Sequence, residues 1–133
     1  MNVKSNKPLG IETASKVLIE AASPALEIQV LWLYGSQARG DADSSSDVDL
    51  AVAMEPAGAC GEIIESFRAA AAKTLNKSVS VVDINNIPVP LAINIINQGR
   101  VLLCRSAFRL RQEELRIWSL WEAVKYESRR YSN

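Results

Sequence analysis

Two aspartates spaced two residues apart carry the strongest chemical signal in the sequence. Asp47 and Asp49 begin the segment DVDLAVAM, residues 47–54, whose apolar pattern predicts a β-strand. Residues i and i+2 of a strand point to the same face, so we expect the two carboxylates to lie close together. Two neighbouring anions either share a proton or bind a cation, and an all-oxygen site favours Mg2+ or Mn2+. The pair therefore predicts a divalent metal site.

A glycine-serine turn precedes this pair. The apolar run IQVLWLY, residues 28–34, predicts a buried strand that ends at Gly35 and Ser36. Gly35 and Gly40 permit backbone geometries that bring amide groups close to an anion, and we expect Ser36 to cap a short helix over residues 37–39. The segment matches neither the Walker A loop nor the GxGxxG pattern. A phosphate-binding turn beside a divalent ion predicts a nucleotide site.

The acid-rich segment between the turn and the strand allows other interpretations. Its alternating oxygen side chains from Asp41 onward are similar to a calcium loop, but the sixth position is Ser46 instead of Gly and the twelfth is Val52 instead of Glu. We interpret Asp41 and Asp43 as solvated loop charges. The Asp47–Asp49 pair is different, because the strand continues inward as core and charges at its start need a partner.

Composition narrows the possible chemistry. The chain has 133 residues, of which 48% are hydrophobic, so we expect one domain. Lys plus Arg and Asp plus Glu both number 15, which provides no global field for nucleic acid or an anionic membrane. With 0 histidines, the chain cannot use His-based nucleophile pairs or His-ligated zinc. No apolar leader or membrane-spanning run is present, which predicts a cytoplasmic protein.

The two cysteines, Cys60 and Cys104, form no CxxC pair and are interpreted as reduced thiols, with Cys104 in the core. Basic residues near the C-terminus are expected to lie on a solvated helix face paired with glutamates, although contact with an acidic partner surface or RNA stays open. The arginines are Arg105, Arg109, Arg111, Arg116, Arg129 and Arg130, and the glutamates are Glu113, Glu114 and Glu122.

Helical and strand patterns alternate along the chain, which predicts an α/β or α+β fold. The predicted helices cover residues 11–22, 61–75, 90–98 and 107 to about 128, and the predicted strands cover residues 28–34, 47–54, 78–84 and 101–104. We expect residues 1–10 to be an N-terminal extension, residues 11–128 to be the domain with its C-terminal helix, and residues 129–133 to be a tail. The expected apolar stripe of the last helix comprises Leu110, Leu115, Trp118, Trp121 and Val124.

The segment GSQARGDADSSSDVDL resembles the signature of the DNA polymerase beta-like nucleotidyltransferase superfamily, in which about ten residues separate Gly-Ser from Asp-x-Asp. Here 10 residues lie between Ser36 and Asp47. The fuller string, LYGSQARG followed by SDVDLAV, resembles the minimal nucleotidyltransferase group. Members of that group are short single domains, and many are paired in operons with a HEPN-domain toxin. The resemblance implies a small mixed sheet with helices packed on it.

The resemblance also implies a role for each matching residue. The turn residues would bind the triphosphate, the two aspartates would bind two Mg2+ ions, and Asp83 is the acid placed on a later strand to serve as third metal ligand and base. These assignments comprise the nucleotide-binding residues Gly35, Ser36, Arg39 and Ser46 and the catalytic metal ligands Asp47, Asp49 and Asp83.

The function that the resemblance implies is that of an antitoxin. Such an enzyme would transfer AMP from ATP to a tyrosine hydroxyl of its HEPN toxin, with which it would form an oligomer. One alternative is an antitoxin that neutralises its toxin by occlusion, with Trp118 and Trp121 as an apolar anchor, although core packing is the commoner role of such residues. Another is a small-molecule, aminoglycoside-like nucleotidyltransferase, which usually needs a second domain.

Overall fold

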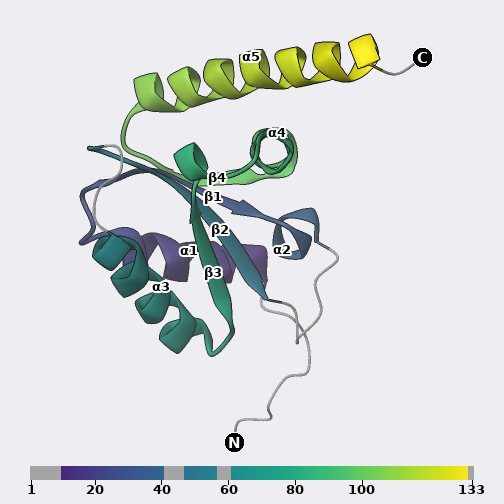
Figure 1. Ribbon diagram of the computed structural model, residues 1–133. Coiled ribbons are helices and arrows are strands. Elements are labelled where there is room, and N and C mark those ends of the chain that lie inside the picture. Colours follow the sequence, from purple (N-terminus) through teal and green to yellow (C-terminus); the bar gives the residue numbers. More distant parts are fainter. Residues whose placement is uncertain (1–9, 41–46, 57–60, 132–133) are drawn as a thin grey trace, which may run out of the picture.

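The chain forms one mixed sheet with helices on both faces. The computed structural model describes residues 10–40, 47–56 and 61–131, so Asp41, Asp43, Ser46 and Cys60 lie outside the described residues. The elements in order are α1 (Ile11–Ala22), β1 (Ile28–Tyr34), α2 (Ser36–Arg39), β2 (Val48–Met54), α3 (Gly61–Leu75), β3 (Val79–Asp83), the 3-10 turn η1 (Ile84–Asn86), α4 (Val89–Gln98), β4 (Arg100–Cys104) and α5 (Ala107–Tyr131) (Figure 1).

The helices and strands confirm the predicted fold class. The sheet has the order β3-β2-β1-β4, with β1 antiparallel to both of its neighbours and β2 parallel to β3. A parallel pair needs a crossover connection, and α3 provides it. The boundaries of the predicted elements agree with the structure to within one residue, except that α5 continues to Tyr131. In the described part of the chain, no helix is both long and apolar enough to cross a membrane.

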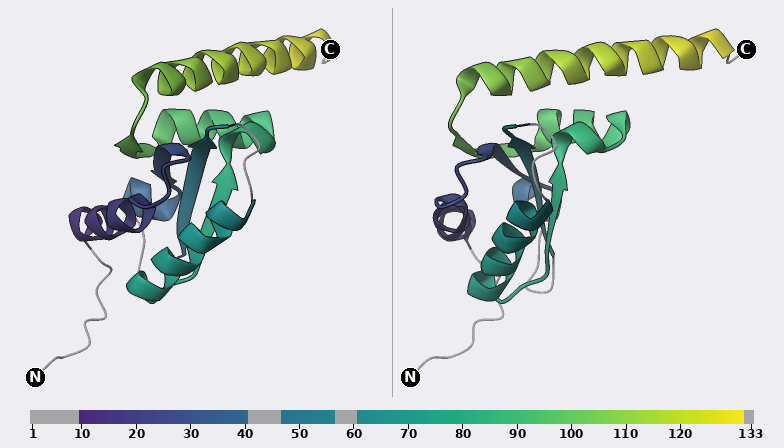
Figure 2. Two further views of the ribbon diagram at one scale, coloured as in Figure 1. Left: turned by 90° about the vertical axis from the view of Figure 1, so that its left-hand side faces the viewer. Right: turned by 60° about the vertical axis from the view of Figure 1, so that its left-hand side comes forward.

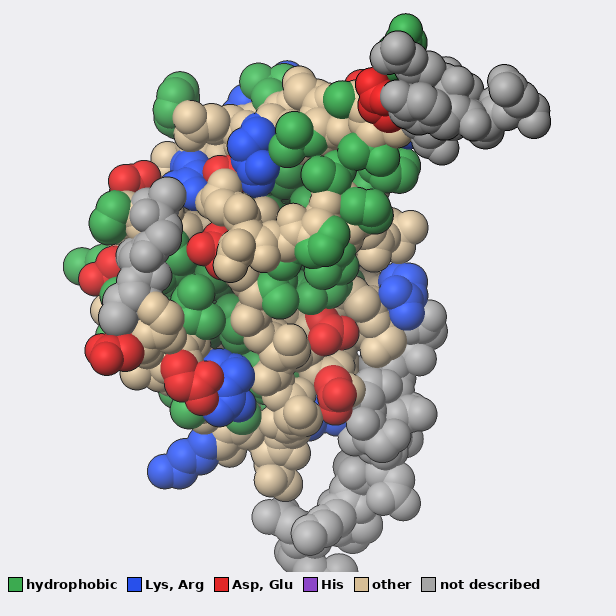
Figure 3. All heavy atoms as spheres, in the orientation of Figure 1, with side chains coloured by type: hydrophobic (Ala, Val, Ile, Leu, Met, Phe, Trp, Pro, Cys, Tyr) green, Lys and Arg blue, Asp and Glu red, His purple; other side chains and the backbone are tan. Residues whose placement is uncertain are grey.

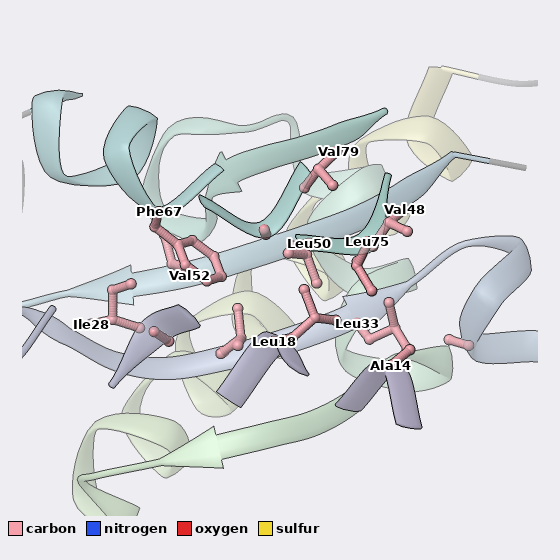
Figure 4. Packing of buried hydrophobic residues seen from close by; sticks show 14 of the residues in the cluster. Ala14, Leu18, Ile28, Leu33, Val48, Leu50, Val52, Phe67, Leu75 and Val79 are labelled. Atoms are coloured by element: carbon pink, nitrogen blue, oxygen red, sulfur yellow. The ribbon is translucent and has the colours of Figure 1, made fainter. Parts of the chain in front are cut away.

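The two central strands are buried on both faces. On one face, α1 and α3 cover Leu31 and Leu33 of β1 together with Leu50 of β2 (Figures 2 and 4). On the other face, α4 and α5 cover Trp32 and the small residue Ala51. The large indole of Trp32 lies directly opposite the small side chain of Ala51, as close packing of this second layer requires. Burial on both sides explains why β1 and β2 are almost continuously apolar.

Arg105, expected on a solvated helix face, instead joins β4 to the end of α1. Its guanidinium donates to the carbonyl oxygens of Ala25 at 3.0 Å and of Ile28 at 2.8 Å, and it also donates to Ser23 at 3.0 Å. Ser23 is the C-cap of α1, where orphan carbonyls favour a cation, Ala25 lies in the following loop, and Ile28 is the first residue of β1. The arginine therefore fixes the connection that leads into β1.

The burial of α5 corrects the predicted apolar stripe. Ile117 is completely buried, and Leu110 and Trp121 pack against the core between the sheet and α4. Leu115 lies two residues before Ile117, and the two side chains are therefore about 200° apart around the helix axis. The side chain of Leu115 is 53% exposed. The exposed fractions of Trp118 and Val124 are 40% and 41%. Sequence periodicity did not distinguish the face of α5 that the sheet and α4 cover from the face that they leave open.

Cys104 also differs from its prediction. It was expected in the core, but the structure places it in an exposed position. It is the last residue of β4, and β4 is an edge strand of the sheet. An edge strand lacks a neighbour on one side, so its apolar sequence alone does not guarantee burial.

Candidate active site

The turn after β1 has a backbone conformation that favours glycine. Gly35 has φ 75° and ψ −154°, a region that residues with a side chain rarely adopt. Gly35 is the N-cap of α2, whereas Ser36 is the first helical residue. The predicted capping role of Ser36 is therefore wrong, because glycine occupies the cap position.

The register of β1 against β2 brings this turn to the aspartates. Tyr34, the last residue of β1, lies directly opposite Asp49. A Cβ atom built on Gly35 would be 2.6 Å from Oδ2 of Asp49, closer than real side chains approach. Glycine is therefore required here twice, by its backbone angles and by the carboxylate beside it. The turn and the acidic strand, 10 residues apart in sequence between Ser36 and Asp47, form one site.

The two carboxylates of the site repel each other, and the nearby positive charge of Arg39 compensates this repulsion only in part. Burial raises the pKa of Asp49, and the charge of Asp47 raises it further, whereas Arg39 lowers it. Burial and the charge of Asp49 likewise raise the pKa of Tyr34. Asp49 is half-buried and Asp47 is exposed. A divalent cation between two such carboxylates would relieve their repulsion, so the donor set fits a hard, oxygen-preferring metal.

The short helix that carries Arg39 is held by the edge strand. Nε of Arg100, the first residue of β4, donates to the carbonyl oxygen of Ala38 at 3.2 Å. Ala38 is buried in the core between the sheet and α1. This contact links β4 to α2, and Arg100 is also the register partner of Leu33 in β1. The sequence analysis did not identify Arg100, and only its place beside α2 in the fold reveals it.

The structure does not bring Asp83 to the other two aspartates. In the parallel pair of β2 and β3, Asp83 lies opposite Val52, three residues beyond Asp49 and so about 10 Å along the strand. Strand alternation also assigns Asp83 to the face of Val79 and Val81, which pack toward α1 and α3. Its carboxylate accepts a hydrogen bond from the backbone N–H of Asn85 at 2.9 Å and caps η1.

Ser80 occupies the position beside Asp49 instead. The two residues are direct partners in the parallel register, and Ser80 is exposed. Ser80 shares its strand face with Val82, which packs in the layer under α4 and α5. Ala51, two residues after Asp49, packs in the same layer. Asp49 and Ser80 therefore share one face of the sheet.

No sequence pattern singles out Ser80, because its place beside Asp49 depends on the register of β2 with β3. Across residues 10–40, 47–56 and 61–131, no group of three or more Asp, Glu, Cys or His residues is arranged to hold a metal ion. The carboxylates at this site are thus a pair, with a hydroxyl-bearing residue at the next strand position.

Comparison with known protein families supports the signature read from the sequence. A family profile described as "Polymerase beta, Nucleotidyltransferase" matches residues 16–108. This range includes the turn, both aspartates and β3. No curated protein sequence matches the chain.

Several solved structures share the fold. A chain from a toxin–antitoxin crystal structure with AMP-PNP has a TM-score of 0.73 and 19% identity, covering 86% of this chain and 92% of that chain. A chain of the toxin–antitoxin MntA-HepT has a TM-score of 0.68 and 17% identity, covering 89% and 92%. A chain from the complex of a tri-AMPylated Shewanella oneidensis HEPN toxin with its MNT antitoxin has a TM-score of 0.70 and 17% identity, covering 90% and 93%.

Proposed function

Because this chain belongs to the polymerase beta nucleotidyltransferase family, we propose that it transfers a nucleotidyl group from a nucleoside triphosphate to a hydroxyl acceptor. The observation that carries the proposal is the contact between the Gly35 turn and the Asp49 carboxylate. It joins a candidate phosphate-binding backbone to a candidate metal ligand, and nucleotidyl transfer needs both at the reacting phosphate.

Each residue of the site would have a distinct role in nucleotidyl transfer. The backbone of Gly35 and Ser36 would donate to phosphate oxygens, and the guanidinium of Arg39 would add positive charge beside them. Asp47 and Asp49 would hold Mg2+, which when bound stabilises negative charge on the phosphate and lowers the pKa of a coordinated hydroxyl. Ser46, which lies outside the described residues, remains a candidate nucleotide contact on sequence grounds.

We further propose that the donor is ATP and that the acceptor is a tyrosine hydroxyl on a HEPN toxin. The support is the likeness of the fold to chains from toxin–antitoxin complexes, one with AMP-PNP and another with a tri-AMPylated toxin. The phenolic oxygen of the tyrosine would form a new bond to the α-phosphorus of ATP, the bond from that phosphorus to the bridging oxygen of the β-phosphate would break, and pyrophosphate would leave. The tyrosine proton would pass to solvent or to a carboxylate of the site.

The test is the intact mass of the cognate toxin after incubation with this protein, ATP and Mg2+. We expect a mass increase of one or more AMP groups on the toxin. The Asp47→Asn/Asp49→Asn variant should fold, because it removes charge repulsion, and should produce no such increase. Toxin of unchanged mass with the wild-type protein, despite a stable complex, would contradict the transfer activity.

One surface favours a second candidate, neutralisation of the toxin by occlusion alone. Apolar side chains on α5 are exposed: Phe108 by 77%, Leu115 by 53% and Trp118 by 40%. Trp121, the other proposed anchor, packs against the protein's own core and is the weaker candidate. Under this alternative, the Asp47→Asn/Asp49→Asn variant would still protect fully against the toxin.

A further inference from the structure

Ser80 lies where a third metal ligand of the site would be expected. The Cα atoms of Asp49 and Ser80 are partners in adjacent parallel strands, which lie about 4.8 Å apart. Both residues belong to the sheet face that α4 and α5 cover farther along the strands. Ser80 is exposed, so its hydroxyl is not committed to the interior.

We propose that Ser80 takes the third protein position of the divalent-metal site, so that the site has two carboxylates and one neutral hydroxyl. This inference rests on the proposed function, because it concerns the same metal. It replaces Asp83, whose carboxylate lies on the other face and caps η1 through the N–H of Asn85. In the part of the chain that the structure describes, no third acid joins the pair.

The net charge of the site then determines whether the metal ion binds by itself or together with the nucleotide. Two carboxylates provide two negative charges, and Arg39 acts on Asp49 in the opposite sense. The affinity of a site for a hard cation rises with the number of charged ligands, so this site should bind the free ion weakly. The phosphates of a nucleotide supply the missing negative charge, and Mg2+ commonly completes its shell with substrate phosphates. The metal should therefore enter together with the nucleotide.

Binding of Mn2+ in the absence of nucleotide tests this inference without any measurement of transfer activity. The electron paramagnetic resonance signal of free Mn2+ is followed as protein is added. Ser80→Asp should tighten Mn2+ binding on the order of tenfold, because it adds a third charged ligand. Ser80→Ala should weaken it. Ser66→Asp is the matched control, since it adds the same charge at an exposed position of α3 on the opposite side of the sheet.

Two further variants identify which carboxylates take part. Asp83→Asn should leave Mn2+ binding unchanged, and Asp47→Asn/Asp49→Asn should abolish it in both the wild-type and the Ser80→Asp backgrounds. Circular dichroism confirms that each variant is folded. A second titration with a non-hydrolysable ATP analogue should show much tighter Mn2+ binding by the wild-type protein than the titration without it.

The outcomes separate this inference from the proposed function. Equal affinities of wild-type and Ser80→Asp, with loss of binding in Asp47→Asn/Asp49→Asn, would overturn the role of Ser80 and leave the metal site intact. Weaker Mn2+ binding by Asp83→Asn would indicate that Asp83 is the third metal ligand and would also overturn the inference. Binding that persists in Asp47→Asn/Asp49→Asn would contradict the proposed metal site itself, and the inference with it.

Discussion

At the scale of single residues, the environment of Asp49 is typical of a functional site and is unfavourable for the stability of the folded protein. It is half-buried, opposite Tyr34 and against Gly35, and burial is the first cause that raises its pKa. The charge of Asp47 raises the pKa further and outweighs the opposing effect of Arg39. A folded protein retains such a carboxylate at a cost in stability, and acids whose pKa is raised by burial and a like charge are more frequent at functional sites.

Gly35 provides the residue-scale prediction. Gly35→Ala should destabilise the protein by about 1–3 kcal/mol, because alanine rarely adopts this backbone conformation and its Cβ would press on the Asp49 carboxylate. Because Asp49 must also move, the variant should lose nucleotidyl transfer. Urea denaturation and the toxin mass measurement report the two effects.

Gly40→Ala is the matched control for Gly35→Ala. Gly40 also has a positive φ, 81°, but a Cβ there would meet no atom of the described residues within 4 Å. Gly40→Ala should lower the free energy of unfolding only through its unfavourable backbone conformation, by about 1–2 kcal/mol. If the two variants were equally stable, the contact with Asp49 would have no energetic consequence and the argument for a sterically required glycine would fail.

At the scale of elements, a buried ionic network attaches α5 to the sheet. Nε of Arg109 donates to Glu113 at 2.8 Å, and its Nη1 donates to the carbonyl oxygen of Met54, at the end of β2, at 2.7 Å. Asn85 of η1 accepts from Arg109 at 2.7 Å and donates to Glu113. The prediction of a solvated helix face is thus wrong for Arg109 and Glu113, which are 8% and 3% exposed.

Removal of Glu113 should therefore be strongly destabilising. Glu113→Ala removes the buried carboxylate partner of Arg109 and leaves only the exposed Glu55, whose Oε2 is 3.3 Å from Nη1 of Arg109, and loss of one partner of a buried pair costs about 3–5 kcal/mol. Glu114→Ala is the control. Oε1 of Glu114 lies 3.7 Å from Nη1 of the exposed Arg111, and surface ion pairs contribute only about 0.2–1 kcal/mol to the free energy of unfolding. Urea denaturation at neutral pH measures both. Equal stabilities of the two variants would contradict a structural role for the network.

The same network predicts a dependence on pH. Burial raises the pKa of Glu113, but hydrogen bonds from Arg109, Arg116 and Asn85 outweigh burial and leave the pKa below its ordinary value of 4.5. The ionised carboxylate therefore stabilises the folded state above the unfolded pKa, and this stabilisation is lost as the pH falls through the folded pKa. The difference in stability between the wild type and Glu113→Ala should decrease in that acidic range and remain constant near neutrality.

At the scale of the whole molecule, α5 extends beyond the body of the domain. Its C-terminal part projects past α4 in every view, so little of the chain covers it there (Figures 1 and 2). Hydrophobic side chains gather along α4 and α5 on the face shown in Figure 3. Leu120 and Val124, 40% and 41% exposed, continue the buried stripe of Ile117 into this uncovered region. An apolar surface of this kind is typical of a site that contacts another protein.

The opposite, outer face of α5, on which Phe108 and Leu115 are exposed, gives a prediction about the partner. Phe108→Ser/Leu115→Ser should change the free energy of unfolding little, because both side chains are already more than half exposed, and it should weaken binding of the HEPN toxin that we propose as the partner at least tenfold. Leu26→Ser is the control, since Leu26 is 69% exposed in the loop after α1. Calorimetric titration of the toxin measures the affinities. Unchanged binding by the double variant would exclude the outer face of α5 from the interface.

The sequence by itself determined the local features of this protein. The order and boundaries of the strands, the Gly35 turn and the spacing of Asp47 and Asp49 all depend on residues close together in the chain, so periodicity and turn chemistry were sufficient to predict them. Tertiary structure decided which distant residues meet. The register of β2 with β3 selects Ser80 instead of Asp83 beside Asp49, and the docking of α5 buries Arg109. Strand register and helix docking arise from packing between segments far apart in sequence, and no local pattern contains that information.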